Sequence, residues 1–129
     1  MTDPHRVLVV DDDTDIRETI IEVLEDAGYQ AVGAANGIEA LAQLRAPADS
    51  WCVVLLDLMM PQMDGRTFRV EQLQDPALSP IPVVIVSAMT DVAEAAEELQ
   101  VAAHVTKPVR LAQLMQIVDR FCPRHDGSE

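Results

Sequence analysis

Positive charge is scarce in this sequence. Its 129 residues include 9 lysines and arginines against 22 aspartates and glutamates, a formal net charge of −13. A field of that sign opposes approach to a phosphate backbone, so we expect no direct binding to DNA or RNA. Part of the acid is a cluster at residues 11–15, and Glu94, Glu97 and Glu98 fit a solvated helix face.

Long apolar runs and leader signals are also missing. No stretch approaches the roughly 20 residues that a membrane-spanning helix needs. Residues 1–6 lack the pattern of a secretory signal peptide. We therefore expect a cytoplasmic protein without membrane contacts.

Cysteine is nearly absent. Cys52 and Cys122 are the two cysteines of the chain, and their spacing matches no metal-binding motif. For a cytoplasmic protein the expected state is two reduced and largely buried thiols.

What is present suits one globular domain. A chain of 129 residues that is 49% hydrophobic can bury a core without staples. We expect the domain to occupy residues 1–122. Residues 123–129 are polar and fit either a terminal tail or the start of a linker.

Apolar runs alternate with stripes at helical spacing along the whole chain. Strands are expected at residues 7–10, 30–34, 51–56, 81–86 and 102–106, and helices at about 16–27, 38–44, 66–73, 92–99 and 111–121. Residues 75–80 are expected to form a polar surface connection. Because the strands are continuously apolar, both faces of the sheet should be covered. This predicts an α/β fold with a doubly wound five-stranded parallel sheet and five helices.

Polar residues follow the ends of four of these strands. They are Asp11-Asp12, Asp57, Ser87 and Lys107. In a parallel sheet the carboxyl ends of the strands share one edge, where ligands bind. Carboxylates suit Mg²⁺, and a lone carboxylate can attack a phosphoryl group to form an aspartyl-phosphate. An ammonium and a hydroxyl would stabilise the transferring oxygens.

Other motifs share the first acidic cluster. Residues 11–22 carry acids at four positions of an EF-hand calcium loop, but Ile16 stands where that loop needs glycine. Asp11-Asp12-Asp13 also fits the Asp-x-Asp motif of haloacid-dehalogenase-type phosphatases, although the chain is short for such an enzyme. A small metal-dependent phosphatase is therefore the less favoured alternative.

Taken together, the motifs identify a family. Residues 7–13 (VLVVDDD), 57–61 (DLMMP) with Asp64-Gly65, Ser87-Ala88 and Lys107-Pro108 resemble a response-regulator receiver domain of two-component signalling, similar to chemotaxis regulators. The resemblance covers residues 6 to about 121. It implies a flavodoxin-like sheet of order 2-1-3-4-5. It also implies that the protein is no enzyme beyond its own phosphorylation and dephosphorylation.

The resemblance assigns roles to the site residues. Asp57 is expected to accept a phosphoryl group from a sensor histidine kinase or phosphotransfer protein. Asp11, Asp12, Asp57 and the backbone carbonyl of Met59 are expected to hold Mg²⁺. Lys107 would contact the phosphoryl group, and the Lys107-Pro108 bond is expected to be cis.

A switch is also implied. Ser87 would be drawn toward the phosphoryl group, and the residue three positions before the lysine would rotate into the space left behind. That residue is His104 here, in place of the usual Tyr or Phe. Either it is a buried strand histidine bonded to a neighbour, or it takes part in the switch. In the second case we expect a mildly pH-sensitive activation.

Several positions depart from the family pattern. Met59 and Met89 flank the expected path of the hydrolytic water, and thioethers orient water poorly. Slow self-dephosphorylation is therefore predicted. The usual Gly-Ala before the fifth strand is Gln100-Val101, so that turn is expected to differ.

The expected output is control of a partner protein or output domain through the face around the fourth helix, fifth strand and fifth helix. Dimerisation through that face is possible. The alternative is a stand-alone receiver that serves a phosphorelay or acts as a phosphate sink.

Overall fold

The computed structural model describes residues 6–45, 51–60, 63–88 and 92–122. The strands are β1 (Arg6–Val10), β2 (Gln30–Ala34), β3 (Trp51–Leu56), β4 (Val83–Ser87) and β5 (Ala103–Thr106). The helices are α1 (Thr14–Asp26), α2 (Gly37–Arg45), α3 (Gly65–Gln74), α4 (Val92–Leu99) and α5 (Leu111–Phe121). Among the described helices, none is long and apolar enough to cross a bilayer.

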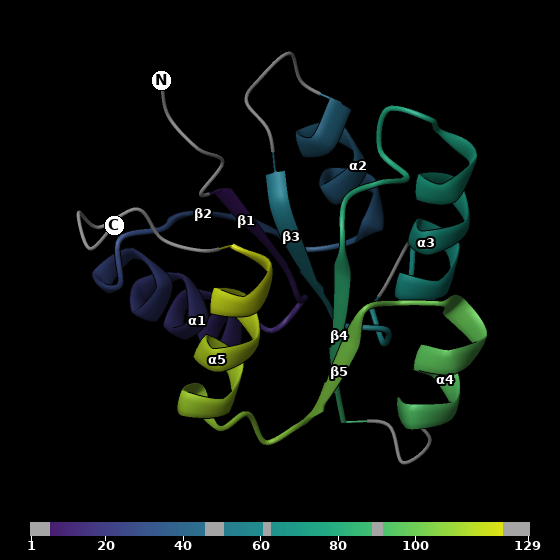
Figure 1. Ribbon diagram of the computed structural model, residues 1–129. Coiled ribbons are helices and arrows are strands. Elements are labelled where there is room, and N and C mark those ends of the chain that lie inside the picture. Colours follow the sequence, from purple (N-terminus) through teal and green to yellow (C-terminus); the bar gives the residue numbers. More distant parts are fainter. Residues whose placement is uncertain (1–5, 46–50, 61–62, 89–91, 123–129) are drawn as a thin grey trace.

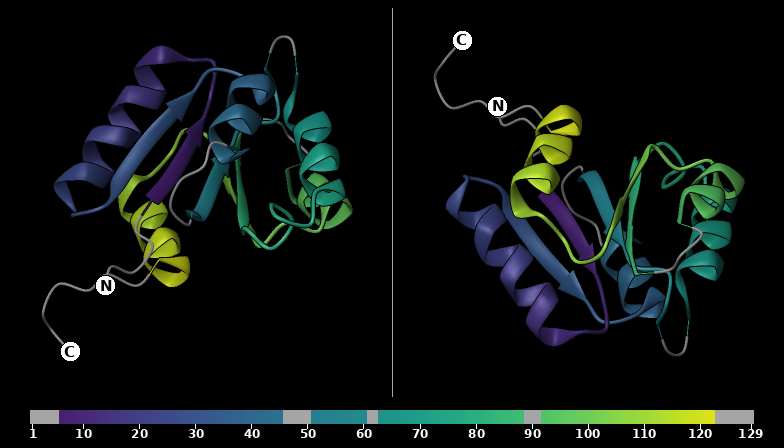
Figure 2. Two further views of the ribbon diagram at one scale, coloured as in Figure 1. Left: turned by 90° about the horizontal axis from the view of Figure 1, so that it is seen from above. Right: turned by 90° about the horizontal axis from the view of Figure 1, so that it is seen from below.

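The strands form one parallel sheet of order β2-β1-β3-β4-β5, as predicted. Helices α1 and α5 cover one face, and α2, α3 and α4 cover the other (Figure 1). The views from above and below show the twisted sheet between these two helical layers (Figure 2). The doubly wound α/β fold is therefore confirmed.

Successive residues of a strand point to opposite faces of the sheet and pack into two separate hydrophobic cores. In β1, Leu8 and Val10 join the cluster under α2, α3 and α4, whereas Val7 and Val9 join the cluster under α1 and α5. All six residues of β3 are buried. The continuous apolar runs of the sequence thus reflect burial on both faces of the sheet.

Aspartates cap the N-termini of two helices. The Asp13 side chain accepts a hydrogen bond from the Ile16 amide at 3.2 Å and caps α1. The Asp64 side chain accepts one from the Thr67 amide at 2.9 Å and caps α3. Asp13 therefore has a structural role, which separates it from the two aspartates before it.

The connection before β4 differs from the prediction. Leu78 is buried in the core, so residues 75–80 do not form a purely superficial loop. The strand begins at Val83 because Pro82 has no amide hydrogen to donate. The Pro82 carbonyl nevertheless accepts a hydrogen bond from the Val54 amide at 2.9 Å and joins the ladder from outside the strand.

The prediction of two reduced thiols is wrong for this structure. Cys52 and Cys122 are buried, as expected, but they form a disulfide with a Cα–Cα distance of 5.4 Å. The bond joins the start of β3 to the residue after α5, across a sequence separation of 70. Spacing alone could not indicate this pair, because the two residues meet only when α5 packs on the sheet.

Candidate functional site

The predicted strand-end residues meet at one edge of the sheet. Asp11 follows β1, Asp57 follows β3, Ser87 ends β4 and Lys107 follows β5. Parallel registry aligns these ends, since Val10 pairs with Leu56 in neighbouring strands. The site is therefore built by the order of the strands, as the sequence predicted.

Asp57 is the central carboxylate, and only 5% of it is exposed. Its amide donates to the Val10 carbonyl at 2.9 Å, which fixes its backbone to the end of β1. Its Oδ1 accepts a hydrogen bond from the Met59 amide at 3.1 Å, and its Oδ2 lies 3.1 Å from Lys107 Nζ. Both oxygens are thus oriented before any ligand arrives.

Asp11 is equally enclosed, with 3% exposure. Its Oδ2 lies 2.7 Å from Lys107 Nζ, and its Oδ1 accepts from the Asp13 amide at 2.9 Å. Lys107 therefore forms two ion pairs, one with each buried carboxylate. Such charge-assisted bonds in a low-dielectric site hold all three side chains in place.

Arg17 is a site residue that the sequence reasoning missed. From α1 its Nη1 donates to the backbone carbonyl of Asp11 at 2.7 Å. A Cβ atom on Gly33 of β2 would lie 3.0 Å from Arg17 Cδ, so glycine leaves room for the arginine. The only sequence signal was a cation one helical turn after the Asp13 cap.

Burial and charge in the site shift two pKa values. Burial raises the pKa of Asp57, and this effect exceeds the opposing influence of the Met59 amide and the Lys107 charge. Burial alone would lower the pKa of Lys107, but the hydrogen bond to Asp11 and the charges of both carboxylates outweigh it and raise the pKa. Nearby positive charge from Lys107 thus favours the ionised form of Asp57.

The donor set fits a hard divalent cation. One carboxylate oxygen each from Asp11, Asp12 and Asp57 lies within 4.8 Å of the others, and Asp12 is exposed where the other two are buried. Oxygen donors with one open side match the preference of Mg²⁺ for a few carboxylates plus water and phosphate.

Ser87 and Lys107 are linked through the backbone. Ser87 is fully buried, and its carbonyl accepts a hydrogen bond from the Lys107 amide at 2.9 Å. The Lys107-Pro108 peptide bond is cis, as expected. This bond therefore holds the end of β4, which carries the Ser87 hydroxyl, beside the end of β5, which leads to the Lys107 ammonium.

The three residues expected to tune the site have different positions. His104 is exposed on β5, so the alternative of a buried strand histidine is wrong. The Met59 side chain is 63% exposed at the rim of the site. Met89 lies outside the described residues.

Comparisons with known proteins identify the family of the chain. The profile of the response regulator receiver domain matches residues 7–119. The chain belongs to the response regulator receiver domain family. It is thus the receiver domain of a two-component response regulator, a class of signalling domain rather than an enzyme in the usual sense.

Relatives place the receiver domain among longer proteins. The chain is 31% identical over 119 residues to the transcriptional regulatory protein PdtaR of Mycobacterium tuberculosis, covering 90% of this chain and 56% of PdtaR. It spans about half the length of that relative.

Solved receiver structures match over nearly the whole chain. A receiver protein from Pseudomonas putida has a TM-score of 0.84 at 30% identity, covering 93% of this chain and 99% of that one. The phosphorylated cyanobacterial phytochrome response regulator RcpA has a TM-score of 0.78 at 32% identity, covering 93% and 94%.

Proposed function

We propose that Asp57 is the phosphoryl acceptor of this receiver domain. The observation that carries the proposal is the pairing of Asp57 with Lys107 at 3.1 Å, beside Asp11, at the carboxyl edge of the sheet. An Asp57 oxygen forms the new bond to phosphorus. The bond from phosphorus to the donor nitrogen or oxygen breaks, and its electron pair leaves with the donor group.

Asp11, Asp12 and Asp57 would hold Mg²⁺, together with the backbone carbonyl of Met59. The bound ion supplies positive charge to the phosphoryl oxygens. Asp11 and Asp57 are pre-positioned for this task by the Asp13 and Met59 amides at 2.9 and 3.1 Å. Because burial raises the pKa of Asp57, added positive charge also favours its nucleophilic, ionised form.

Lys107 and Ser87 would bind the oxygens of the phosphoryl group. Phosphorylation adds negative charge that Lys107 can pair with in place of one carboxylate. Movement of the Ser87 hydroxyl toward the new oxygens displaces its loop, and His104 on the neighbouring edge strand responds. The backbone bond between Lys107 and Ser87 makes the two ends move together.

The phosphoryl donor in this proposal is a sensor histidine kinase or a phosphotransfer protein. The output is control of a partner protein or output domain through α4, β5 and α5. The cytoplasm is the proposed compartment, because a kinase that draws on ATP must reach Asp57. Similarity to a phosphorylated response regulator supports the acceptor chemistry.

Acetyl phosphate with Mg²⁺ tests the assignment of Asp57. We expect one phosphoryl group on the wild-type chain, seen as a mobility shift on a phosphate-binding gel and by intact mass. Asp57→Ala should abolish it, and Asp75→Ala, which removes an aspartate of the α3–β4 connection, should not. Phosphorylation that persists in Asp57→Ala would overturn the assignment.

A further inference from the structure

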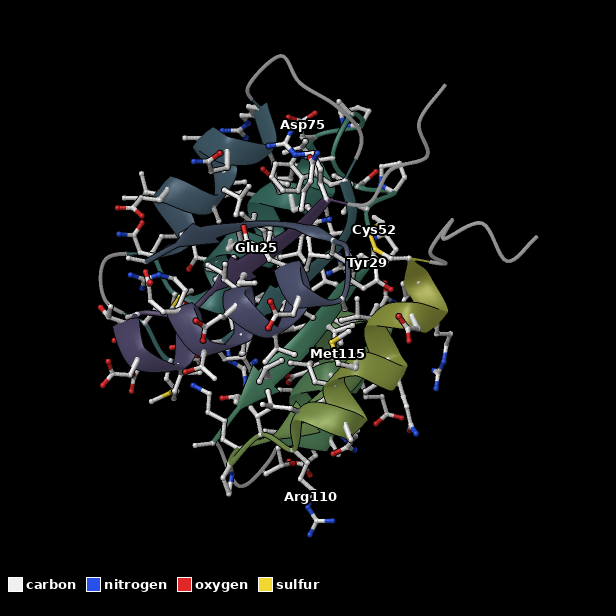
Figure 3. All side chains as sticks on the ribbon, turned by 90° about the vertical axis from the view of Figure 1, so that its left-hand side faces the viewer. Glu25, Tyr29, Cys52, Asp75, Arg110 and Met115 are labelled. Atoms are coloured by element: carbon white, nitrogen blue, oxygen red, sulfur yellow. A yellow bond between two sulfur atoms is a disulfide. The ribbon has the colours of Figure 1, made fainter. Side chains whose placement is uncertain are left out.

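The disulfide lies at the edge of the sheet opposite to the phosphoryl site. Cys52 is the second residue of β3, and Cys122 directly follows α5. Figure 3 shows Cys52 and Tyr29 near one end of α5, with Arg110 at the other. The helix thus begins near the Lys107 loop and ends at the sulfur pair.

Polar contacts around the pair suit both of its oxidation states. Cys52 Sγ lies 3.2 Å from the backbone carbonyl of Arg6, so a thiol at that position has a hydrogen-bond acceptor ready. Besides the disulfide, a hydrogen bond holds Cys122 in place, because the Tyr29 hydroxyl donates to its backbone carbonyl at 2.9 Å. Tyr29 also contacts the Asp119 carboxylate of α5. Breaking the sulfur bond therefore leaves the Cys52 thiol with an acceptor and Cys122 attached through its backbone carbonyl.

We propose that Cys52 and Cys122 form a reversible redox site that exchanges with a small thiol of the glutathione class. In reduction, two thiols give up two electrons and two protons and become one small-molecule disulfide, while the protein disulfide becomes two thiols. Oxidation is the reverse. In the cytoplasm proposed above, native disulfides are typically redox-sensing rather than permanent. That interpretation rests on the proposed compartment, whereas the exchange chemistry does not.

Burial determines which of the two sulfur atoms is attacked first. Cys52 is 7% exposed and Cys122 is fully buried. An incoming thiolate therefore attacks the Cys52 sulfur and forms a mixed disulfide there, with Cys122 as the leaving thiolate. In oxidation, Cys122 is the resolving cysteine that displaces the small thiol from Cys52.

The consequence falls on the last turn of α5. In the oxidised form this turn is tied covalently to β3, and in the reduced form the hydrogen bond from Tyr29 and side-chain packing remain. The site therefore sets how firmly one element of the proposed output face is held. Redox state and signalling face are connected through a single helix.

Titration of the wild-type chain tests reversibility without any substitution. The protein is equilibrated without denaturant at graded ratios of reduced to oxidised glutathione and quenched with acid. It is then unfolded in denaturant at neutral pH, labelled with a maleimide and weighed. We expect one transition between an unlabelled and a doubly labelled monomer, independent of protein concentration. Two labels even in fully oxidised buffer, or no label after excess dithiothreitol, would overturn the proposal. None of these outcomes depends on phosphorylation of Asp57.

Two single variants test the order of attack. With oxidised glutathione, Cys122→Ser should keep one glutathione on Cys52, whereas Cys52→Ser should take up about tenfold less, since Cys122 is buried. Equal or reversed labelling contradicts the assigned order. Circular dichroism melts of both variants show whether each is folded at the labelling temperature.

Hydrogen exchange of the wild-type chain tests the structural consequence. Reduction should speed amide exchange in the last turn of α5 by about tenfold while exchange in α2 stays unchanged. Tyr29→Phe should enlarge the effect because it removes the second tie. Unchanged exchange in α5 on reduction contradicts the role assigned to the disulfide.

Discussion

At the scale of single residues, Lys107 balances the site. Its Nζ lies 2.7 Å from one buried carboxylate and 3.1 Å from another, so two negative charges share one ammonium. A buried carboxylate without a partner is costly. The positive charge of Lys107 therefore favours the ionised form of Asp57, which links its reactivity to Lys107 and to a bound cation.

Met59 is one of the two residues, with Met89, that we expect to tune the phosphoryl lifetime. Its amide donates a hydrogen bond that orients Asp57. Its side chain is exposed and ends in a thioether, which is a weak hydrogen-bond partner for a water molecule. Substitution Met59→Asn keeps the amide and adds a polar group. We expect dephosphorylation about tenfold faster, equal to about 1.4 kcal/mol in the barrier.

The measurement is decay of the phosphorylated band after removal of acetyl phosphate. Leu73→Asn is the matched control, because Leu73 is an exposed apolar residue on α3 at a distance from the strand-end site. It should leave the lifetime unchanged. Equal lifetimes for Met59→Asn and wild type would show that Met59 does not limit hydrolysis.

At the scale of elements, a buried arginine joins α3 to α4. Arg69 donates to the carbonyls of Leu99 and Gln100 at 3.0 and 2.8 Å, and to Gln72 Oε1 at 2.8 Å. These partners are neutral, and burial lowers the pKa of Arg69. Gln100 has a φ of 56°, a left-handed conformation that glycine usually adopts. The bond to its carbonyl helps to hold that turn.

Arg69→Met should therefore destabilise the domain strongly. It removes three charge-assisted hydrogen bonds and leaves two carbonyls at the end of α4 without this donor, which we expect to lower the free energy of unfolding by about 3 kcal/mol. Arg66→Met is the matched control. Its ion pair with Glu98 is exposed at 2.9 Å, so its loss should cost under about 1 kcal/mol.

Urea unfolding followed by circular dichroism measures both values. Similar losses for Arg69→Met and Arg66→Met would mean that the contacts of Arg69 contribute no more than a surface ion pair. A loss confined to the Arg69 variant would identify the α3–α4 connection as a stabilising element of the fold.

The sequence predicted whatever depends on local pattern. The strands, the helices and the meeting of Asp57 with Lys107 follow from apolar runs and from the residues at their ends, whereas the strand order followed from the resemblance to the receiver family. The disulfide, the Arg69 bonds and the burial of Leu78 depend on elements far apart in the chain, and no local signal marks them. His104 is exposed on β5, whereas its neighbour Val105 on the opposite face of the same strand is buried.

At the scale of the whole molecule, excess acid and the proposed metal site act together. The net charge is −13, and three carboxylates converge at one edge of the sheet. Any cation relieves some of the general repulsion by screening. Only a divalent ion bound by the cluster should stabilise the fold beyond that screening, because binding to the native state alone shifts unfolding by mass action.

Mg²⁺ should therefore raise the melting temperature more than NaCl of equal ionic strength. At a Mg²⁺ concentration about ten times the dissociation constant, the gain in stability is about 1.4 kcal/mol, or roughly 4 °C in melting temperature for a domain of this size.

Asp12→Asn should be at least as stable as wild type without Mg²⁺, since one repelling charge is gone, and should gain little stability from Mg²⁺. Glu22→Gln removes an equal charge from α1 outside the cluster and should keep the full gain. Calorimetry of the three proteins with Mg²⁺ and with EDTA measures these shifts. An equal gain in NaCl, or a full gain in Asp12→Asn, would mean that Mg²⁺ acts on the overall charge and not on the cluster.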